Sequence, residues 1–118
     1  MSNESTLTDS EITKLMVGRW QCRPYVNQGM RWSYVSEFTA DGRCTIQGTG
    51  ENNGQTIPFN NAGQWWIEQQ VLVYKIEESS IPALVGRETR DPLISIEPNS
   101  ACWRNTAGHE AYLDRITE

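Results

Sequence analysis

The sequence predicts an all-β protein, an up-and-down antiparallel β-barrel of about eight strands with one short N-terminal helix. Three observations lead to this prediction. A single helical pattern occupies residues 8–18, and short segments of alternating apolar and polar residues follow it. Turn residues separate these segments at even spacing, with no long crossover between them. The 118 residues are the size of one domain, which we place at residues 8–118 after a polar, flexible tail over residues 1–7.

The helical segment begins with a capping box. Thr8 and Glu11 stand three residues apart, so each side chain can accept a hydrogen bond from the backbone N–H of the other residue. An apolar stripe at helical spacing follows, made of Ile12, Leu15 and Met16. Gly18 is then expected to end the helix in the left-handed conformation. The segment therefore predicts one helix of two to three turns.

The next segments alternate with a period of two. Trp20 and Cys22 share one face of a first strand, which Pro24 interrupts. After a turn at residues 27–29, the strongest strand of the chain presents one face made of Met30, Trp32, Tyr34, Ser36 and Phe38. Asp41-Gly42 then predicts a hairpin turn. The return strand carries Cys44, Ile46 and Gly48 on the same side.

Two separate strands are expected in the middle of the chain. A turn over residues 50–54 leads into a short strand around residues 56–59, where Pro58 indicates an edge position or a bulge. The second strand covers residues 63–67, and its adjacent tryptophans must face opposite sides of the sheet. It turns at residues 68–70 into another strand.

The last part of the chain begins with a strand over residues 71–76 and then becomes irregular. Residues 79–86 fit either a short helix or a lid-like loop. Three more short strands follow, over residues 93–96, 101–104 and 111–116. Sequential hairpins of this kind favour an up-and-down barrel over a Greek-key sandwich.

Three short motifs give the chain a family resemblance. Gly18-Arg19-Trp20 opens the first strand directly after the helix, Glu37-Phe38-Thr39-Ala40-Asp41-Gly42 forms a hairpin, and Gly63-Gln64-Trp65-Trp66-Ile67 turns into Val71-Leu72. With these motifs the layout resembles the lipocalin and calycin superfamily, in particular its small bacterial lipocalin-like domains. In that superfamily an arginine of the last strand packs over the tryptophan of the first strand. The resemblance implies that Trp20 and Arg115 close the barrel here.

Composition and charge exclude several classes of partner. The chain has 10 Lys+Arg against 15 Asp+Glu, a formal net charge of -5, which disfavours nucleic acid and anionic membrane surfaces. No apolar run approaches the ~18 residues of a membrane span. Residues 1–6 have neither the positive nor the apolar region of a signal peptide, so we expect a cytoplasmic protein.

Catalytic and metal chemistry are not expected. The single histidine, His109, lies in a turn, where it is typically solvated, and no glycine-rich phosphate loop is present. Cys22, Cys44 and Cys102 are expected to be buried reduced thiols. A zinc site made of these cysteines and His109 lacks the paired spacing of structural zinc modules. We therefore predict a protein that is not an enzyme and holds neither metal nor cofactor.

Binding remains as the predicted function. A barrel of about eight strands can hold one small ligand, and mostly apolar walls with a few hydroxyls suit a small apolar molecule. The expected ligand-binding residues are Trp32, Tyr34, Ser36, Phe38, Ile46, Trp65, Leu72 and Tyr74. Three alternatives stay open. These side chains fill the barrel completely, the chain is a small acidic inhibitor or immunity-type protein with an exposed aromatic and arginine surface, or an edge near Pro58 pairs two copies into a homodimer.

Overall fold

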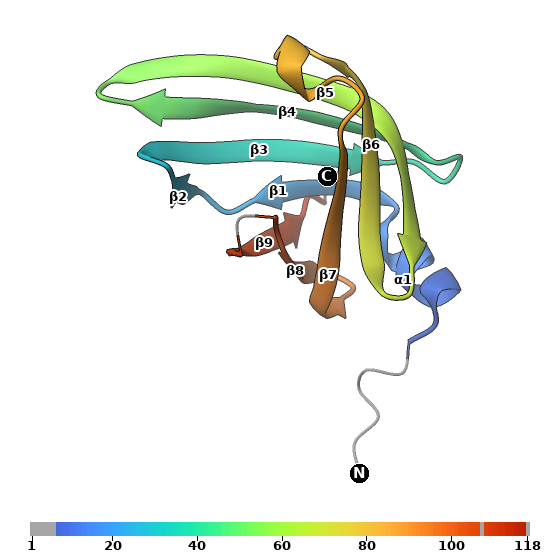
Figure 1. Cartoon of the computed structure of the whole chain (residues 1–118). Coiled ribbons are helices and arrows are strands. Elements are labelled where there is room, and N and C mark those ends of the chain that lie inside the picture. The colour runs from blue at the N-terminus through green and yellow to red at the C-terminus, as the bar shows by residue number, and fades with distance from the viewer. Residues whose placement is uncertain (1–6, 107, 118) are drawn as a thin grey trace.

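The computed structural model describes residues 7–106 and 108–117, which form one α-helix, nine β-strands and one short 3₁₀ helix (Figure 1). In chain order the elements are α1 (Asp9–Met16), β1 (Gly18–Cys22), β2 (Tyr25–Asn27), β3 (Met30–Phe38), β4 (Arg43–Asn52), β5 (Gln55–Glu68), β6 (Val71–Ser79), the 3₁₀ helix η1 (Pro82–Leu84), β7 (Glu88–Glu97), β8 (Ser100–Arg104) and β9 (Glu110–Arg115). Residues 1–6 of the predicted tail, and Ala107 and Glu118 of the predicted domain, lie outside the described residues.

The strands form one closed antiparallel barrel. Each strand from β2 to β9 pairs with the next along the chain, and β1 closes the sheet by pairing with both β9 and β3. β1 and β2 follow one another along β3, with Arg23 and Pro24 between them, so the nine described strands occupy eight positions around the barrel. The predicted fold class, with its up-and-down order, eight positions and one short helix, is confirmed.

Helix α1 begins as the sequence predicts. Thr8 Oγ1 accepts a hydrogen bond from the Glu11 amide at 3.1 Å, and Glu11 Oε1 accepts one from the Thr8 amide at 2.8 Å. Ile12 and Met16 are fully buried in the core, whereas Leu15 is only half-buried. Leu7, expected in the tail, packs against the same core and so belongs to the folded domain.

The end of the helix differs from the prediction. α1 stops at Met16, and Val17 is already extended, so Gly18 is the first residue of β1 and not a helix cap. Its φ of 135° still requires glycine. A methyl group on Gly18 would also collide with Nη1 of Arg115. Glycine at this position therefore allows the Arg115 side chain of β9 to approach the backbone closely.

Strand β5 corrects the prediction of two separate strands. It runs for 14 residues through the whole region, including residues 60–62, which lie between the two predicted strands. Its first residues pair only with β4, because the pairing with β6 starts at Asn61, and Pro58 therefore lies on an open edge where a missing N–H costs nothing. At Gly63 the ladder with β6 shifts register, and a side chain there would collide with the carbonyl oxygen of Lys75. This glycine marks a bulge and not a break.

The two adjacent tryptophans face opposite sides, as predicted. Trp65 is buried in the core, and Trp66 is 37% exposed on the outer face, where its indole N–H donates to Glu68 at 3.0 Å. Val73, directly opposite Trp66 on β6, also faces outward and yet is fully buried. Trp66 and Arg90 are its two cross-strand neighbours, so the outer tryptophan helps to cover an apolar residue on the sheet.

The irregular segment after β6 is shorter than predicted. Residues 82–84 form η1, and β7 already starts at Glu88, five residues before the strand expected there. β7 carries Pro92 inside it, opposite Val71 at the start of β6. As a result Thr89 and Asp91, expected in a loop, are strand residues. No helix in the described part of the chain is long and apolar enough to cross a membrane.

Candidate functional site

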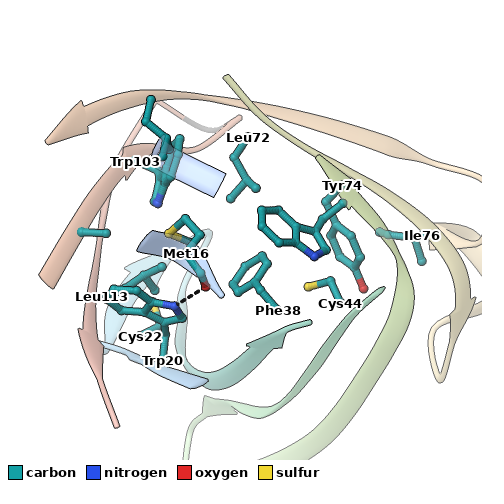
Figure 2. Close-up of a cluster of buried hydrophobic side chains, with 13 residues drawn as sticks. Met16, Trp20, Cys22, Phe38, Cys44, Leu72, Tyr74, Ile76, Trp103 and Leu113 are labelled. Atoms are coloured by element: carbon teal, nitrogen blue, oxygen red, sulfur yellow. Dashed lines mark hydrogen bonds between the residues drawn. The ribbon is translucent and has the colours of Figure 1, made fainter. Parts of the chain in front are cut away.

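The barrel is hollow at one end and packed at the other. α1 lies beside the β5–β6 turn, where Asp9 accepts hydrogen bonds from the amides of Gln69 and Gln70 at 2.7 and 3.0 Å (Figure 1). Ile12 and Met16 of α1 seal this end against a cluster of buried side chains (Figure 2). The helix therefore closes this end of the barrel, and the mouth is at the other end. The mouth lies at the far end of β6, near η1 and the β2–β3 turn.

A cavity of about 480 Å³ occupies the barrel toward this mouth. That volume lies within the range of small-molecule sites. Its walls are mainly apolar and aromatic, and the polar residues among them include amides, threonines and one carboxylate. The lining includes Tyr25, Met30, Trp32, Tyr34, Ser36, Phe38, Ile46, Phe59, Leu72, Tyr74, Leu84, Thr89, Asp91, Asn105 and Trp103. The side chains therefore do not fill the barrel completely.

Seven of the eight predicted ligand-binding residues lie in this lining: Trp32, Tyr34, Ser36, Phe38, Ile46, Leu72 and Tyr74. The eighth, Trp65, lies outside it, in the packed region. The Trp65 ring packs edge-on against Phe38, with centroids 5.1 Å apart and planes at 77°. Its indole N–H donates to the Thr39 carbonyl at 3.0 Å. Trp65 points into the barrel, as its alternation predicts, but at the height where the core is solid.

Several lining residues were not predicted. Tyr25 and Phe59 belong to strands that sequence patterning missed or shortened, and Thr89 and Asp91 belong to the early half of β7. Alternation of Thr89, Asp91 and Leu93 is a readable sequence signal, but Pro92 within it indicates a loop. Trp103 was expected in a strand, and it is fully buried with its ring against the cavity.

Three aromatic rings pack against one another in the cavity wall. The rings of Trp32 and Phe59 meet edge to face with centroids 5.5 Å apart, and those of Tyr34 and Phe59 with centroids 6.5 Å apart. Edge-to-face contacts of this kind hold rings in fixed orientations. The aromatic wall is therefore supported from within before any ligand enters.

Four buried polar atoms of the cavity wall lack a hydrogen-bond partner among the described residues. They are Ser36 Oγ, Tyr74 OH, Asp91 Oδ1 and Trp103 Nε1, and all four residues line the cavity. The great majority of buried polar side-chain atoms in proteins are hydrogen-bonded, and an unmade bond costs about 1–3 kcal/mol. Four such atoms around one cavity are the property expected of a site whose partner is a bound molecule.

Asp91 is the acidic residue of the cavity wall. Burial raises the pKa of this carboxyl from 3.8 to about 6. Burial also raises the pKa of Tyr25 to about 12 and that of Tyr34 well above its ordinary value, and the charge of Asp91 adds to both shifts. The two tyrosines therefore lie within electrostatic reach of Asp91 and stay neutral at physiological pH.

Trp20 and Arg115 meet at the packed end. They are paired residues of β1 and β9, and the guanidinium carbon lies 4.3 Å from the centroid of the indole ring. The Trp20 indole N–H donates to the Met16 carbonyl at 2.9 Å (Figure 2). Arg115 donates to the carbonyls of Leu15, Val17 and Pro98. Arg115 thus binds the last turn of α1 to the barrel at the point where β1 closes it.

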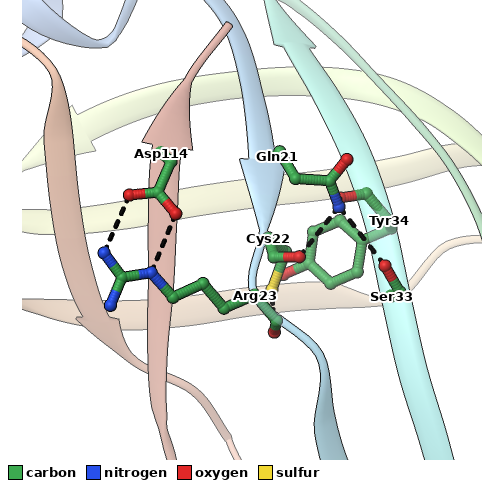
Figure 3. Close-up of polar contacts among 6 residues, drawn as sticks. All are labelled: Gln21, Cys22, Arg23, Ser33, Tyr34 and Asp114. Atoms are coloured by element: carbon green, nitrogen blue, oxygen red, sulfur yellow. Dashed lines mark hydrogen bonds and ion pairs between the residues drawn. The ribbon is translucent and has the colours of Figure 1, made fainter.

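A second group of contacts crosses the closing seam on the outside (Figure 3). Arg23 binds the Asp114 carboxylate with two nitrogens, at 2.8 and 2.9 Å, and so joins β9 to the chain after β1. The Gln21 amide nitrogen donates to the carbonyls of Cys22 and Tyr34 and to Ser33 Oγ, which joins β1 to β3. These contacts hold β9, β1 and β3 together, and Tyr34 projects into the cavity from β3.

Comparisons with known proteins agree with this architecture. No protein-family model matches the chain, and no curated protein matches it. Among solved structures it is similar to a designed protein described as "De novo design of a fluorescence-activating beta barrel". The two are 17% identical, the match covers 93% of this chain and 100% of that one, and the TM-score is 0.54. At this identity the likeness shows the fold, a closed β-barrel, and nothing of the function.

The remaining candidate residues lie apart from one another. Cys22, Cys44 and Cys102 are buried free thiols, as expected. His109 is exposed in the loop before β9, where its amide donates to Asn105 Oδ1 at 3.0 Å. Over residues 7–106 and 108–117, no three His, Cys, Asp or Glu side chains are placed to hold a metal ion.

Proposed function

We propose that this chain is a non-enzymatic binding protein that holds one small, largely apolar molecule inside a lipocalin-like barrel. The observation that carries the proposal is the cavity of about 480 Å³ with four unpartnered polar atoms in its wall. An apolar wall supplies affinity through burial, and a few polar atoms supply orientation. The closure of the barrel by Trp20 and Arg115 supports the lipocalin-like assignment, because the motifs of that superfamily place these two residue types together.

The proposal is of binding without catalysis. The hydroxyl and thiol groups in the lining, Ser36 and Cys44 among them, have no histidine beside them, because His109 lies in an exposed loop. Burial raises the pKa of the Cys44 thiol to about 12, so it is protonated and a poor nucleophile at neutral pH. Nucleophiles without a histidine base beside them favour a passive site.

The alternative of an acidic protein-binding module, an inhibitor or immunity-type protein, is kept as an outcome of the test. Trp66 is an exposed aromatic ring of the kind that such a surface needs, but this ring has a hydrogen-bond partner in Glu68 and covers Val73. Other exposed apolar residues, such as Val26 and Ile94, lie on separate strands. The open edge of β5 around Pro58 is where a homodimer would pair, and the proline limits that edge to few hydrogen bonds.

The test is a titration with a neutral fluorescent probe, N-phenyl-1-naphthylamine, together with a cavity-filling variant. Ser36→Leu adds bulk to the cavity wall, and Thr45→Leu adds the same side chain to the exposed outer face of β4. We expect saturable binding at one site per chain, at least tenfold weaker affinity in Ser36→Leu, and unchanged affinity in Thr45→Leu. An affinity that Ser36→Leu leaves unchanged, or an absence of saturable binding, contradicts the proposal. A stable protein partner recovered by pull-down from the native host, with no probe binding, favours the alternative.

A further inference from the structure

We propose that the cavity selects a lipophilic molecule that carries a single positive charge, an amine whose ammonium group lies beside Asp91. This inference rests on the proposed function, since it requires that the cavity be a ligand site. It adds the charge and chemical class of the ligand, which shape and apolar character alone leave open. Three features of the cavity support it: the sign of its charges, the environment of one carboxylate, and the aromatic wall near that carboxylate.

The lining of the cavity carries charge of one sign only. Among the described residues that line it, Asp91 is the single acidic one, and none is a lysine, arginine or histidine. Oδ1 of Asp91 is buried and has no hydrogen-bond partner in the described chain. Such a carboxylate has no cation of the cavity lining to stabilise its charge.

A ligand with an ammonium group supplies what Asp91 lacks. The N–H groups donate to the unpartnered oxygen, and the positive charge compensates the desolvated negative one. An anionic ligand meets repulsion from Asp91 without any compensating cation in the wall. A neutral ligand leaves the carboxylate in an apolar cavity from which it has also expelled water.

The aromatic wall favours the same ligand. Trp32, Tyr34 and Phe59 form a contiguous group of rings in the lining, and Tyr25 lies close enough to Asp91 to respond to its charge. The faces of aromatic rings attract cations, and this attraction is strongest where water is excluded. A hydrocarbon chain or ring attached to the amine fills the apolar remainder of the cavity, toward Phe38 and Ile46.

The pH dependence of ligand binding should reflect one side chain of the cavity wall. The other titratable side chains in the lining are Tyr25, Tyr34, Tyr74 and Cys44, and burial raises the pKa of all four. They therefore stay neutral between pH 5 and pH 7.5, and Asp91 is the lining group that changes its charge in that range. A cationic ligand that prefers the carboxylate should bind more weakly as Asp91 takes up a proton.

The experiment uses three probes with one hydrocarbon part and three charges. They are 4-phenylbutylamine, 4-phenylbutan-1-ol and 4-phenylbutanoate, each measured against the full chain by isothermal titration calorimetry at pH 7.5. We expect the amine to bind at least tenfold more tightly than the alcohol, and the carboxylate to bind most weakly. The amine should also lose about tenfold in affinity between pH 7.5 and pH 5, while the alcohol changes little.

Two variants assign the preference to one side chain. Asp91→Asn keeps the shape of the residue and removes its charge, so it should weaken the amine at least tenfold, reduce its pH dependence and leave the alcohol within a factor of three. Glu88→Gln is the matched control, because Glu88 is an exposed carboxylate three residues away on the outer face of β7. It makes the same change in net charge and should leave all three probes unaffected.

The failures of the two proposals are distinguishable. If the alcohol and the amine bind equally, and Asp91→Asn changes neither, the cavity binds small molecules but the charge preference is wrong. The same conclusion follows if the carboxylate binds best, or if the amine binds more tightly at pH 5. If none of the probes binds at millimolar concentration, nor does N-phenyl-1-naphthylamine, the proposed function itself is wrong.

Discussion

Buried tryptophans differ in their hydrogen bonding between the two ends of the barrel. At the helix end, the indole N–H of Trp20 donates to the Met16 carbonyl and that of Trp65 to the Thr39 carbonyl. Beside the cavity, the equally buried indole N–H of Trp103 has no partner in the described chain. Arg115 likewise binds three carbonyls at the helix end, whereas Asp91 Oδ1 is unpartnered in the cavity wall. These indole, guanidinium and carboxylate groups are thus paired where the barrel is solid and unpaired where it is hollow.

The two ends of the barrel therefore have different roles: the packed end contributes to stability and the hollow end to binding. The same strands run through both ends, so β3 supplies Phe38 to the packed region and Trp32 to the mouth. α1 fills one end of the barrel, and nothing of comparable bulk in the described chain fills the other. Substitutions at the helix end should therefore reduce the free energy of unfolding, and substitutions at the mouth should change binding more than stability.

The largest expected effect is that of Trp20→Ala. The side chain is fully buried, carries Arg115 on its face and anchors α1, so we expect a loss of about 3–5 kcal/mol in the free energy of unfolding. Trp32→Ala removes a half-buried ring at the mouth and should cost about 1 kcal/mol while it weakens probe binding. Urea unfolding followed by far-UV circular dichroism measures the loss of stability in both variants. Equal losses from the two substitutions would contradict the division between a structural end and a binding end.

Gly18→Ala should have the next largest effect. A methyl group there meets Arg115 and the residue has a positive φ, so we expect a loss of about 2–3 kcal/mol. Gly29→Ala is the matched control, because Gly29 also has a positive φ but stands in open space at the β2–β3 turn, and it should cost about 1 kcal/mol. If the two variants lose the same free energy in urea titrations, the close approach of Arg115 to Gly18 contributes nothing.

The packed end was also the more predictable end. The capping box at Thr8, the alternation from Trp20 onward and the opposite orientations of Trp65 and Trp66 were all readable, because each depends on residues close in sequence. The single long strand β5 could not be predicted, because proline and glycine usually interrupt strands, and β5 contains Pro58 and Gly63. Both are tolerated for reasons that lie in other strands, namely the open edge beside Pro58 and the bulge against β6.

The site was predictable in its walls and not in its chemistry. Alternation of β3 identified Trp32, Tyr34 and Ser36, since inward residues of a barrel necessarily face its interior. Asp91 was missed, because its neighbour Pro92 made the first half of β7 resemble a loop. Whether the interior is hollow depends on the summed volume of side chains from every strand, and no local pattern contains that sum.

A third prediction concerns the cost of the unpartnered carboxylate. The pKa of Asp91 is raised from 3.8 to about 6 by burial, so the folded state binds more protons than the unfolded state between these values. Its contribution to stability is therefore unfavourable above about pH 6 and disappears as pH falls below about 4. Asp91→Asn should raise the free energy of unfolding by about 1–2 kcal/mol at pH 7.5, with the gain absent at pH 4.

The control for this gain is Glu88→Gln, which lowers the negative charge equally on the outer face. It removes an ion pair with Arg90 at 2.7 Å and should change stability by less than about 1 kcal/mol in the unfavourable direction. A gain in Glu88→Gln equal to that in Asp91→Asn would mean that relief of the overall negative charge, and not burial of Asp91, is responsible. Urea titrations at both pH values decide between them.

The smallest effect, that of Thr8→Ala, gives the sharpest test of the separation between the two ends. Loss of the hydroxyl leaves the Glu11 amide without its cap and should cost about 0.5–1 kcal/mol, whereas Ser10→Ala on the exposed side of α1 should cost almost nothing. Such a loss leaves the native state dominant, so the affinity for N-phenyl-1-naphthylamine should stay within a factor of two. If Thr8→Ala weakens the probe severalfold while the protein remains folded, the helix controls the cavity from the opposite end. The barrel would then be one coupled unit, since its capped and open ends could not change independently.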